Sequence, residues 1–227
     1  MKLKWRILAS YFSGKIKMKT TSAPTLTNQQ LRLAIRKRRA ALPPHEQKHL
    51  SHKAASHLSS QTLFRNARYI ALYLPVKGEA DPTFLRKLTH PRQQLYLPVL
   101  SPFGDARLWF VLWNKHTRFR LNRFQIPEPL PHWRYSRPAR WIDLVITPLV
   151  AVDKHGSRLG MGGGFYDRTF SFKRIPANNS RRPYLCGFAY AFQQVESLPR
   201  QPWDVPLDAV ASDCGFFSLI LDYIRIY

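Results

Sequence analysis

The sequence predicts an α/β fold: a single domain with an open, mainly parallel sheet and helices on both faces, in a three-layer α/β/α arrangement. Three observations predict it. Apolar runs of strand length recur along the chain, as expected of strands that are covered on both faces. A strand, a helix start and a second strand follow one another within residues 69–100, which indicates a βαβ unit. Apolar residues make up 44% of the 227-residue chain, enough for a packed core.

Two helices are expected before the first strand. Across residues 31–42, apolar positions recur at helical spacing around a basic run at 36–39, which predicts an amphipathic helix with a basic face. Two prolines at 43–44 end this helix and start a second one, because proline suits the first helical turn. Apolar residues at four-residue steps extend the second helix to about residue 58.

The pattern then changes to strands. Five are expected, at residues 69–74, 94–100, 108–113, 143–147 and 184–188. Between the first two, Asp81 and Pro82 form a good helix start, since aspartate caps helices and proline tolerates the first turn. The proline-rich stretch 126–138 is expected to be a loop before the fourth strand.

Both ends of the chain differ from the middle in composition. We expect a domain at residues 28–212, preceded by a basic extension at 1–27 and followed by an apolar tail at 213–227. For this extension we favour a solvated tail over a weak helix that lies at a membrane interface. Met18 stays open as an alternative start.

Several features favour the cytoplasm. The first residues resemble a signal sequence, but their apolar part is short, is broken by Arg6 and Ser10, and has no clear cleavage site. The longest apolar stretch, residues 144–152, is far shorter than the roughly 20 residues of a membrane helix. Cys186 and Cys214 fit neither a disulfide framework nor a metal-binding spacing. We therefore expect a cytoplasmic protein without a transmembrane segment.

The net charge of +23 indicates anionic partners. Basic residues cluster at 1–20, 28–53 and 168–182, with a single acidic residue among the three clusters. Such a field concentrates polyanions, whether nucleic acid, nucleotides or a polyglutamylated cofactor. Charge alone does not choose among them, because any basic surface binds nucleic acid non-specifically.

The most informative segment is residues 143–167. A buried strand leads to Arg158, and four glycines follow within five positions, at 160, 162, 163 and 164. Glycine lets backbone N–H groups approach a phosphate closely, and a helix starting near Gly164 would point its positive end at the anion. Arg158 can pair with phosphate oxygens, and Asp167 can hold the cation that accompanies a triphosphate. The spacing fits neither the Rossmann motif nor the P-loop.

Residues 158–168, with the sequence RLGMGGGFYDR, resemble the R-L-G-x-G-x-G-Y-Y-D signature of 5-formyltetrahydrofolate cyclo-ligases. The resemblance covers residues 28–212, and further family motifs recur in the family's order. They lie at residues 31–39, 73–74, 78–81, 97–99, 126–129, 147–150 and 203–208. The glycine block together with these ordered motifs is specific, whereas any one of them alone would not be.

The resemblance implies an ATP- and Mg²⁺-dependent cyclisation of 5-formyltetrahydrofolate to 5,10-methenyltetrahydrofolate, with ADP and phosphate released. The implied route phosphorylates the formyl oxygen, which turns a poor leaving group into a good one. The protein would then supply positioning and charge stabilisation. ATP is the implied co-substrate, Mg²⁺ the cofactor, and the folate, with one or several glutamates, the substrate. We expect a monomer without a specific nucleic-acid partner.

The resemblance also implies a role for individual positions. Substrate binding is implied for Leu74 and Glu79, and metal binding for Asp167 and Asp208. Catalytic roles are implied for Glu79, Arg158 and Tyr166. ATP binding is implied for Asn28, Arg32, Arg158, Leu159, Gly160, Met161, Gly162, Gly163, Gly164, Phe165 and Tyr166.

Two positions depart from the family pattern. Asn28 stands where the family usually has lysine or arginine, so it brings a hydrogen bond but no charge. Phe165 replaces the commoner first tyrosine, which keeps the ring and loses the hydroxyl. On charge alone, Arg36 and Arg39 are near-equal alternatives to Arg32.

Three acidic residues have a structural alternative. Glu79 and Asp81 both follow a strand and can cap a helix, and for Asp81 capping is the expected role. For Asp208 the alternative is a turn residue before a last strand.

Two other functions compete with the ligase. Residues 45–49 match the H-E-x-x-H pattern of zinc peptidases, but they follow two prolines among polar residues and lack a convincing third ligand. A nucleic-acid-binding protein is the second alternative, from the charge, six tryptophans and ten tyrosines. No helix-turn-helix, RRM or zinc-finger pattern supports it, and packing in strands explains most of the aromatic residues. Both rank below the ligase.

Overall fold

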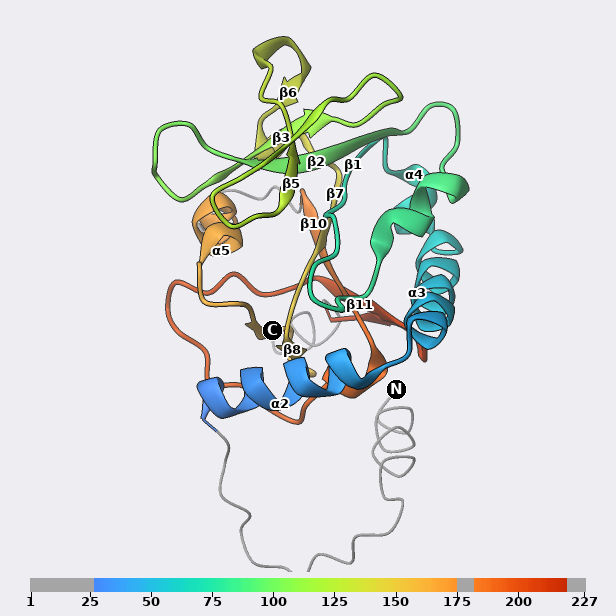
Figure 1. Ribbon diagram of the computed structural model, residues 1–227, viewed down its shortest axis with the longest axis vertical. Coiled ribbons are helices and arrows are strands. Elements are labelled where there is room, and N and C mark those ends of the chain that lie inside the picture. Colours follow the sequence, from blue (N-terminus) through green and yellow to red (C-terminus); the bar gives the residue numbers. More distant parts are fainter. Residues whose placement is uncertain (1–26, 175–181, 220–227) are drawn as a thin grey trace, which may run out of the picture.

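An eight-stranded sheet runs through the part of the chain described by the computed structural model, residues 27–174 and 182–219 (Figure 1). Its strand order is β12-β11-β10-β7-β1-β2-β3-β6. In that order the strands are Gly215–Ser218, Ala209–Ser212, Tyr184–Ala189, Leu144–Thr147, Tyr69–Ala71, Gln94–Leu100, Leu108–Leu112 and Ser136–Arg137. The strands from β11 to β2 are parallel, and antiparallel strands flank them on both sides. The expected open, mainly parallel sheet is confirmed.

The predicted βαβ unit is present, with a different helix type. β1 and β2 are parallel, and the element between them is the 3₁₀ helix η1 (Pro82–Leu88). Asp81 caps it as expected, because its carboxylate accepts a hydrogen bond of 2.8 Å from the Thr83 N–H. β1 ends at Ala71, earlier than predicted, and the chain then runs on to a turn at Lys77 and Gly78, both with positive φ.

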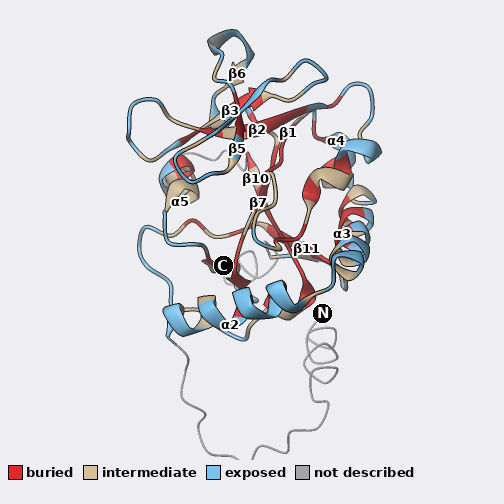
Figure 2. Ribbon diagram, in the orientation of Figure 1, coloured by how far each residue is buried: buried red, intermediate tan, exposed pale blue. Residues whose placement is uncertain are grey.

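Neighbouring residues of each strand contribute to opposite faces of the sheet. Ile70 and Leu144 belong to one apolar cluster, whereas Ala71 and Val145 belong to another. This is the alternation that a strand imposes on successive side chains. All four side chains are buried, so the sheet is covered on both faces (Figure 2).

Helices form the two outer layers, as predicted. α3 (Pro44–Ser59), α4 (Thr62–Asn66) and η1 cover one face. α5 (Phe165–Thr169) and η4 (Ser171–Arg174) cover the other, on the far side of the sheet from α3 (Figure 1). The short helix α4 was not predicted.

Helix α2 (Asn28–Ala41) begins three residues earlier than predicted. Thr27 and Gln30 form a capping box, in which each side chain accepts a hydrogen bond from the other's backbone. The apolar face of α2, with Leu31 and Ile35, packs on the hairpin of β8 (Ala151–Val152) and β9 (Arg158–Leu159). This contact places α2 beside the glycine-rich loop that follows β9.

The proline-rich stretch 126–138 is not a plain loop, so this prediction was wrong in part. It contains β5 (Pro127–Pro129), which pairs with β4 (Phe119–Leu121), and also β6. Proline is compatible with edge strands, where its missing N–H is not needed for a ladder. Three 3₁₀ helices complete the described elements, at Trp133–Tyr135, Ala139–Trp141 and Ala191–Gln193.

The sheet continues past the expected domain end at residue 212, because β12 pairs antiparallel with β11. The expected extension lies outside the described residues except for Thr27, as do residues 220–227 of the expected tail. In the described ranges, none of the helices has the length and apolar character that a membrane span requires.

Candidate active site

The glycine-rich loop, residues 160–164, connects β9 to α5. A Cβ added at Gly160 or Gly162 would meet nothing within 4 Å. Gly162 and Gly164 have positive φ, which favours glycine, but Gly160 does not. Neither local packing nor the backbone therefore accounts for glycine at position 160, and the open space beside it is available to a ligand. The helix that follows has only five residues, so its dipole contributes less than the sequence suggested.

Helix α2 brings a second predicted group to this loop. The Arg32 Nε donates a hydrogen bond of 2.9 Å to the Gly160 carbonyl oxygen, although 128 positions separate the two residues. Asn28 precedes Arg32 by one helical turn and is partly exposed on the same side of α2. The structure thus brings Arg32 into direct contact with the loop, while Arg36 is exposed one turn further on.

Arg158 and Asp167 join the two ends of the loop. The Arg158 Nη2 lies 2.7 Å from the Asp167 Oδ1, which also accepts a hydrogen bond of 3.1 Å from the Val205 N–H. The Arg158 guanidinium lies 5.4 Å from the centre of the Tyr166 ring. The guanidinium is therefore held in place by Asp167, and its buried Nη1 is left without a hydrogen-bond partner among the described residues.

Glu79 is buried next to Arg39, which the sequence offered only as an alternative to Arg32 and not as a partner of Glu79. Its Oε1 lies 3.7 Å from the Arg39 Nη1, and its Oε2 accepts a hydrogen bond of 3.2 Å from the Val76 N–H. Burial raises the pKa of Glu79, and the positive charge of Arg39 opposes that rise. Arg39 thus keeps Glu79 closer to its ionised form.

Arg39 itself is fully buried, and none of its three guanidinium nitrogens has a hydrogen-bond partner among the described residues. A buried charge is costly unless it is both paired and hydrogen-bonded, and Glu79 at 3.7 Å supplies only the pairing. A signal for its burial was present in the sequence. Arg39 follows Leu31 and Ile35 at four-residue steps, which places it on the apolar face of α2.

Tyrosines surround Glu79. The Tyr73 hydroxyl donates a hydrogen bond of 2.6 Å to the Ala80 carbonyl, and the Tyr190 hydroxyl donates one of 3.4 Å to the Glu79 carbonyl. Burial raises the pKa of Tyr73, Tyr166 and Tyr190 above the ordinary value. The three phenols are therefore neutral near pH 7, so Tyr166 can offer a hydrogen bond or its ring but not a phenolate base.

The remaining predicted positions differ in exposure. Leu159 is buried in β9, and Met161 is 48% exposed at the loop. Leu74 is half-buried and packs against the core face that α3 covers. The two histidines of the H-E-x-x-H pattern, His45 and His49, are exposed on α3.

The two predicted metal ligands each contact a basic side chain. Asp167 is paired with Arg158, as described above, and the Asp208 Oδ2 lies 3.2 Å from the Lys173 Nζ. Asp208 also accepts a hydrogen bond of 2.7 Å from the Leu185 N–H, at the start of β10. In the described ranges no three His, Cys, Asp or Glu side chains converge as a metal site. Magnesium at nucleotide sites needs only one or two carboxylates beside phosphates and water, so Asp167 next to the loop fits that role.

Residues 24–213 match the model of the 5-formyltetrahydrofolate cyclo-ligase family. The chain belongs to this family. The 5-formyltetrahydrofolate cyclo-ligase of Escherichia coli K12 is 38% identical over 183 residues, covering 78% of this chain and 96% of the relative. That of Haemophilus influenzae is 41% identical over 185 residues, covering 81% and 96%. The family predicted from the glycine block and its flanking motifs is confirmed.

Solved structures agree with the cyclo-ligase family fold. The NMR structure of Aquifex aeolicus 5,10-methenyltetrahydrofolate synthetase matches with a TM-score of 0.71 at 31% identity, over 86% of this chain and 94% of that one. The synthetase of Mycoplasma pneumoniae matches with a TM-score of 0.62 at 27% identity, over 83% and 99%.

Proposed function

We propose that this chain catalyses the ATP- and Mg²⁺-dependent cyclisation of 5-formyltetrahydrofolate to 5,10-methenyltetrahydrofolate, with release of ADP and phosphate. The observation that carries the proposal is the glycine loop between Arg158 and Asp167. It has open space at Gly160 and contacts Arg32 from α2. Membership of the cyclo-ligase family supports the choice of reaction. We expect a cytoplasmic monomer.

The proposed reaction has two steps. The γ-phosphoryl group passes to the formyl oxygen, and ADP leaves. N10 of the folate then attacks the formyl carbon and loses its proton, and the C–O bond to phosphate breaks. Because phosphate is a far better leaving group than oxide, the protein needs mainly to position the reactants and stabilise negative charge.

The proposed roles of the chain's residues follow from the contacts around the loop. Backbone N–H groups near Gly160 would bind phosphate oxygens, and the positive charge of Arg158 beside the loop would stabilise them. Glu79 would accept hydrogen bonds from the pterin, and Leu74 would contact it. Asp167 would hold Mg²⁺, which when bound neutralises phosphate charge. A metal role for Asp208 stays a prediction.

Coupling between the two products tests this reaction. We expect one ADP and one phosphate for each methenyl product, measured in parallel on the same sample. Hydrolysis of ATP at the same rate without the folate would contradict a coupled ligase.

Replacing Gly160 with alanine should weaken ATP binding without destabilising the fold. The new methyl group meets no protein atom, so the unfolding free energy should stay within about 0.5 kcal/mol. It would occupy the space assigned to phosphate, and we expect the KM for ATP to rise on the order of tenfold. Thermal unfolding and ATP titration of the turnover rate measure the two effects. An unchanged KM would remove the phosphate role from this side of the loop.

Gly156→Ala is the control for Gly160→Ala, because the fold itself requires glycine at position 156. It has a φ of +81°, and a Cβ there would lie 2.6 Å from the Leu207 carbonyl oxygen. We expect Gly156→Ala to cost about 1–3 kcal/mol of unfolding free energy. A Gly160→Ala protein that unfolds as readily as Gly156→Ala would show that Gly160 is structural.

A further inference from the structure

The end of the molecule opposite α2 carries a surface that the proposed reaction does not use. It consists of the connections before and after β3, the β4–β5 hairpin and the segment up to residue 141 (Figure 1). Residues 103–141 include none of the residues with a proposed role. They hold eight lysines and arginines and two acidic residues, which leaves a net charge of +6. Such a charge attracts anions to this end of the molecule.

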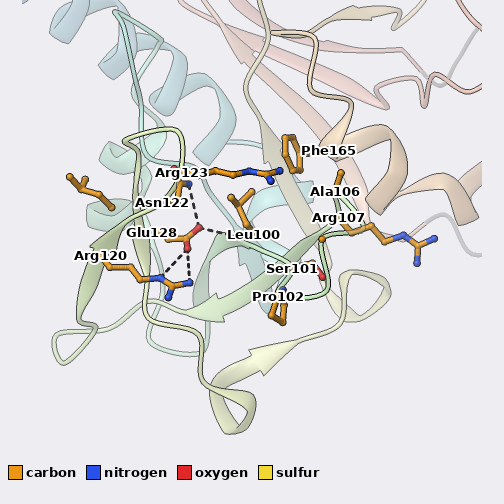
Figure 3. A pocket seen from close by; sticks show the side chains of 12 residues that line it. Leu100, Ser101, Pro102, Ala106, Arg107, Arg120, Asn122, Arg123, Glu128 and Phe165 are labelled. Carbon is orange, nitrogen blue, oxygen red and sulfur yellow. Dashed lines mark hydrogen bonds and ion pairs between the residues drawn. The ribbon is translucent and has the colours of Figure 1, made fainter.

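Both acidic residues of this range are already in contact with an arginine. Glu128 is 3% exposed, and its Oε1 accepts hydrogen bonds of 3.2 and 3.1 Å from the Nε and Nη2 of Arg120 (Figure 3). Its Oε2 accepts a hydrogen bond of 3.1 Å from the Leu100 N–H, which ties the hairpin to β2. Asp105 and Arg107 form a long, exposed contact of 3.9 Å, and such pairs contribute little.

Exposed cations without an acidic partner flank β4. Among the described residues, Lys115, Arg118 and Arg123 form no ion pair with a carboxylate. Arg118 directly precedes β4, and Arg123 follows its last residue by two positions. Their charges can therefore pair with an anionic partner outside this chain.

Large apolar side chains are exposed among these cations. Of the eleven that are exposed in the described ranges, seven lie in residues 103–141. Five of the seven are aromatic: Phe103, Phe119, Phe124, Tyr135 and Trp141. The sequence interpretation explained most aromatic residues by packing. It does not explain these five, which are 43–77% exposed.

The strand β4 combines both features in three residues. Phe119, Arg120 and Leu121 are all exposed, and β4 pairs with β5 in a two-stranded sheet. Alternation along the strand places Phe119 and Leu121 on the face opposite Arg120. Charged residues protect a strand edge from unwanted contacts, whereas exposed apolar residues make it a site of contact. The hairpin therefore has the character of a binding surface.

We propose that the β4–β5 hairpin binds single-stranded RNA without sequence preference. Proteins that bind single strands combine cations along the phosphate backbone with aromatic rings on which unpaired bases stack. Arg118 and Phe119 supply one of each at the start of β4. Unpaired bases are common in the loops and ends of RNA. This binding goes beyond the proposed function and does not depend on it.

An anionic membrane and a nucleic-acid duplex are other polyanions, and the hairpin fits them less well. Insertion into a membrane surface is typical of a helix with a continuous apolar face. Here a short strand and loops carry the apolar residues, and arginines alternate with them along residues 118–124. A duplex keeps its bases stacked, so it would use the charges and leave the rings without a partner.

Fluorescence anisotropy on the full chain tests the charge contribution. The probes are a labelled oligouridylate and its duplex with oligoadenylate, each over a series of salt concentrations. We expect the single strand to bind more tightly, with an affinity that falls as salt rises. Arg118→Gln should reduce the slope of log affinity against log salt by about 0.7, the value of one phosphate contact on a single strand. Arg65→Gln removes the same charge from an exposed position of α4 and should leave the slope unchanged.

Substitution of Phe119 tests the contribution of the ring. Phe119→Leu keeps an apolar side chain and loses the aromatic ring, so the affinity for oligouridylate should fall roughly fivefold to a hundredfold, the range for one stacked base. Phe119→Trp keeps a stacking surface and should retain the affinity. Thermal unfolding checks that both variants are folded. Formation of the methenyl product should be unchanged in both, because the hairpin carries none of the proposed catalytic or binding residues.

Several results would overturn the RNA site. One is the absence of binding to oligouridylate at low salt. Another is unchanged affinity in both Arg118→Gln and Phe119→Leu, which would place the binding elsewhere on this basic chain. Duplex binding as tight as that of the single strand would reduce the surface to its charge. Binding to vesicles that contain phosphatidylserine, without binding to oligouridylate, would make the hairpin a membrane surface.

Turnover measured on the same samples keeps this test separate from the proposed function. If oligouridylate fails to bind while methenyl product forms, the RNA site is wrong and the proposed function stands. If oligouridylate binds through Phe119 and no product forms, the reverse holds. Loss of turnover in Phe119→Leu with unchanged affinity for oligouridylate would assign the hairpin to the folate reaction and overturn the RNA site.

Discussion

Methionine in place of Arg39 is expected to weaken folate binding near pH 7 by roughly tenfold to a hundredfold, the value of a hydrogen bond to a charged group. Arg39 offsets part of the burial that raises the pKa of Glu79. Without it the pKa rises further and a larger fraction of Glu79 is protonated, so the carboxyl group loses its capacity to accept from the pterin. Binding titrations of 5-formyltetrahydrofolate measure the effect.

The pH dependence of Arg39→Met distinguishes this account from simple damage to the fold. Because ionised Glu79 is the proposed binding form, the affinity should improve as the pH rises through the elevated pKa. The neighbouring tyrosines should not contribute to this pH dependence, because burial raises the pKa of Tyr73, Tyr166 and Tyr190 above their ordinary values.

Two further variants serve as controls. Arg39→Lys keeps the charge and should recover part of the affinity, whereas Lys37→Met, at an exposed position of the same helix, should change nothing. If Arg39→Met binds folate as the original protein does at every pH, Arg39 has no part in the site.

Asp167→Asn should lower turnover by about 10²–10³-fold or more, the scale on which loss of one electrostatic group acts at an active site. The substitution removes two proposed functions of Asp167 at once. The Asp167 carboxylate orients Arg158 at 2.7 Å, and it is the proposed ligand of Mg²⁺. An amide is uncharged and a weak ligand for this cation. The fold should persist, because Asp167 is partly exposed.

Kinetics can separate the two functions of Asp167. Loss of a metal ligand raises the Mg²⁺ concentration needed for half-maximal rate, whereas misplacement of Arg158 raises the KM for ATP at saturating Mg²⁺. Arg158→Met should show the second effect alone. Glu196→Gln, the same carboxylate-to-amide change at an exposed position, should leave both constants unchanged. Undiminished turnover in Asp167→Asn would remove both roles.

The fold was largely predictable because its strands are signalled locally. All five expected strands are present, since apolar runs such as 144–147 mark strands covered on both faces. Asp81 caps η1 as expected from its place before Pro82. The short hairpin β4–β5 was missed because its residues are mostly exposed and carry no apolar run.

The site was predictable where it is local and not where it depends on distant pairs. Arg158 and Asp167 lie nine positions apart in one motif, and the structure pairs them directly. Arg39 and Glu79 are forty positions apart. The spacing of Arg39 from Leu31 and Ile35 indicates the buried face of α2, but the pairing with Glu79 follows only from the tertiary fold. The ion pair of Asp208 was likewise not predictable, because its partner Lys173 belongs to a segment with no motif.

The most direct test of the proposed function is the absorbance of the methenyl-folate band after the protein is mixed with 5-formyltetrahydrofolate, ATP and Mg²⁺. We predict a rise that requires all three components and that Asp167→Asn fails to produce. A folded protein that gives no rise with all three present, or the same rise without ATP, would contradict the assignment of this chain as an ATP-dependent cyclo-ligase.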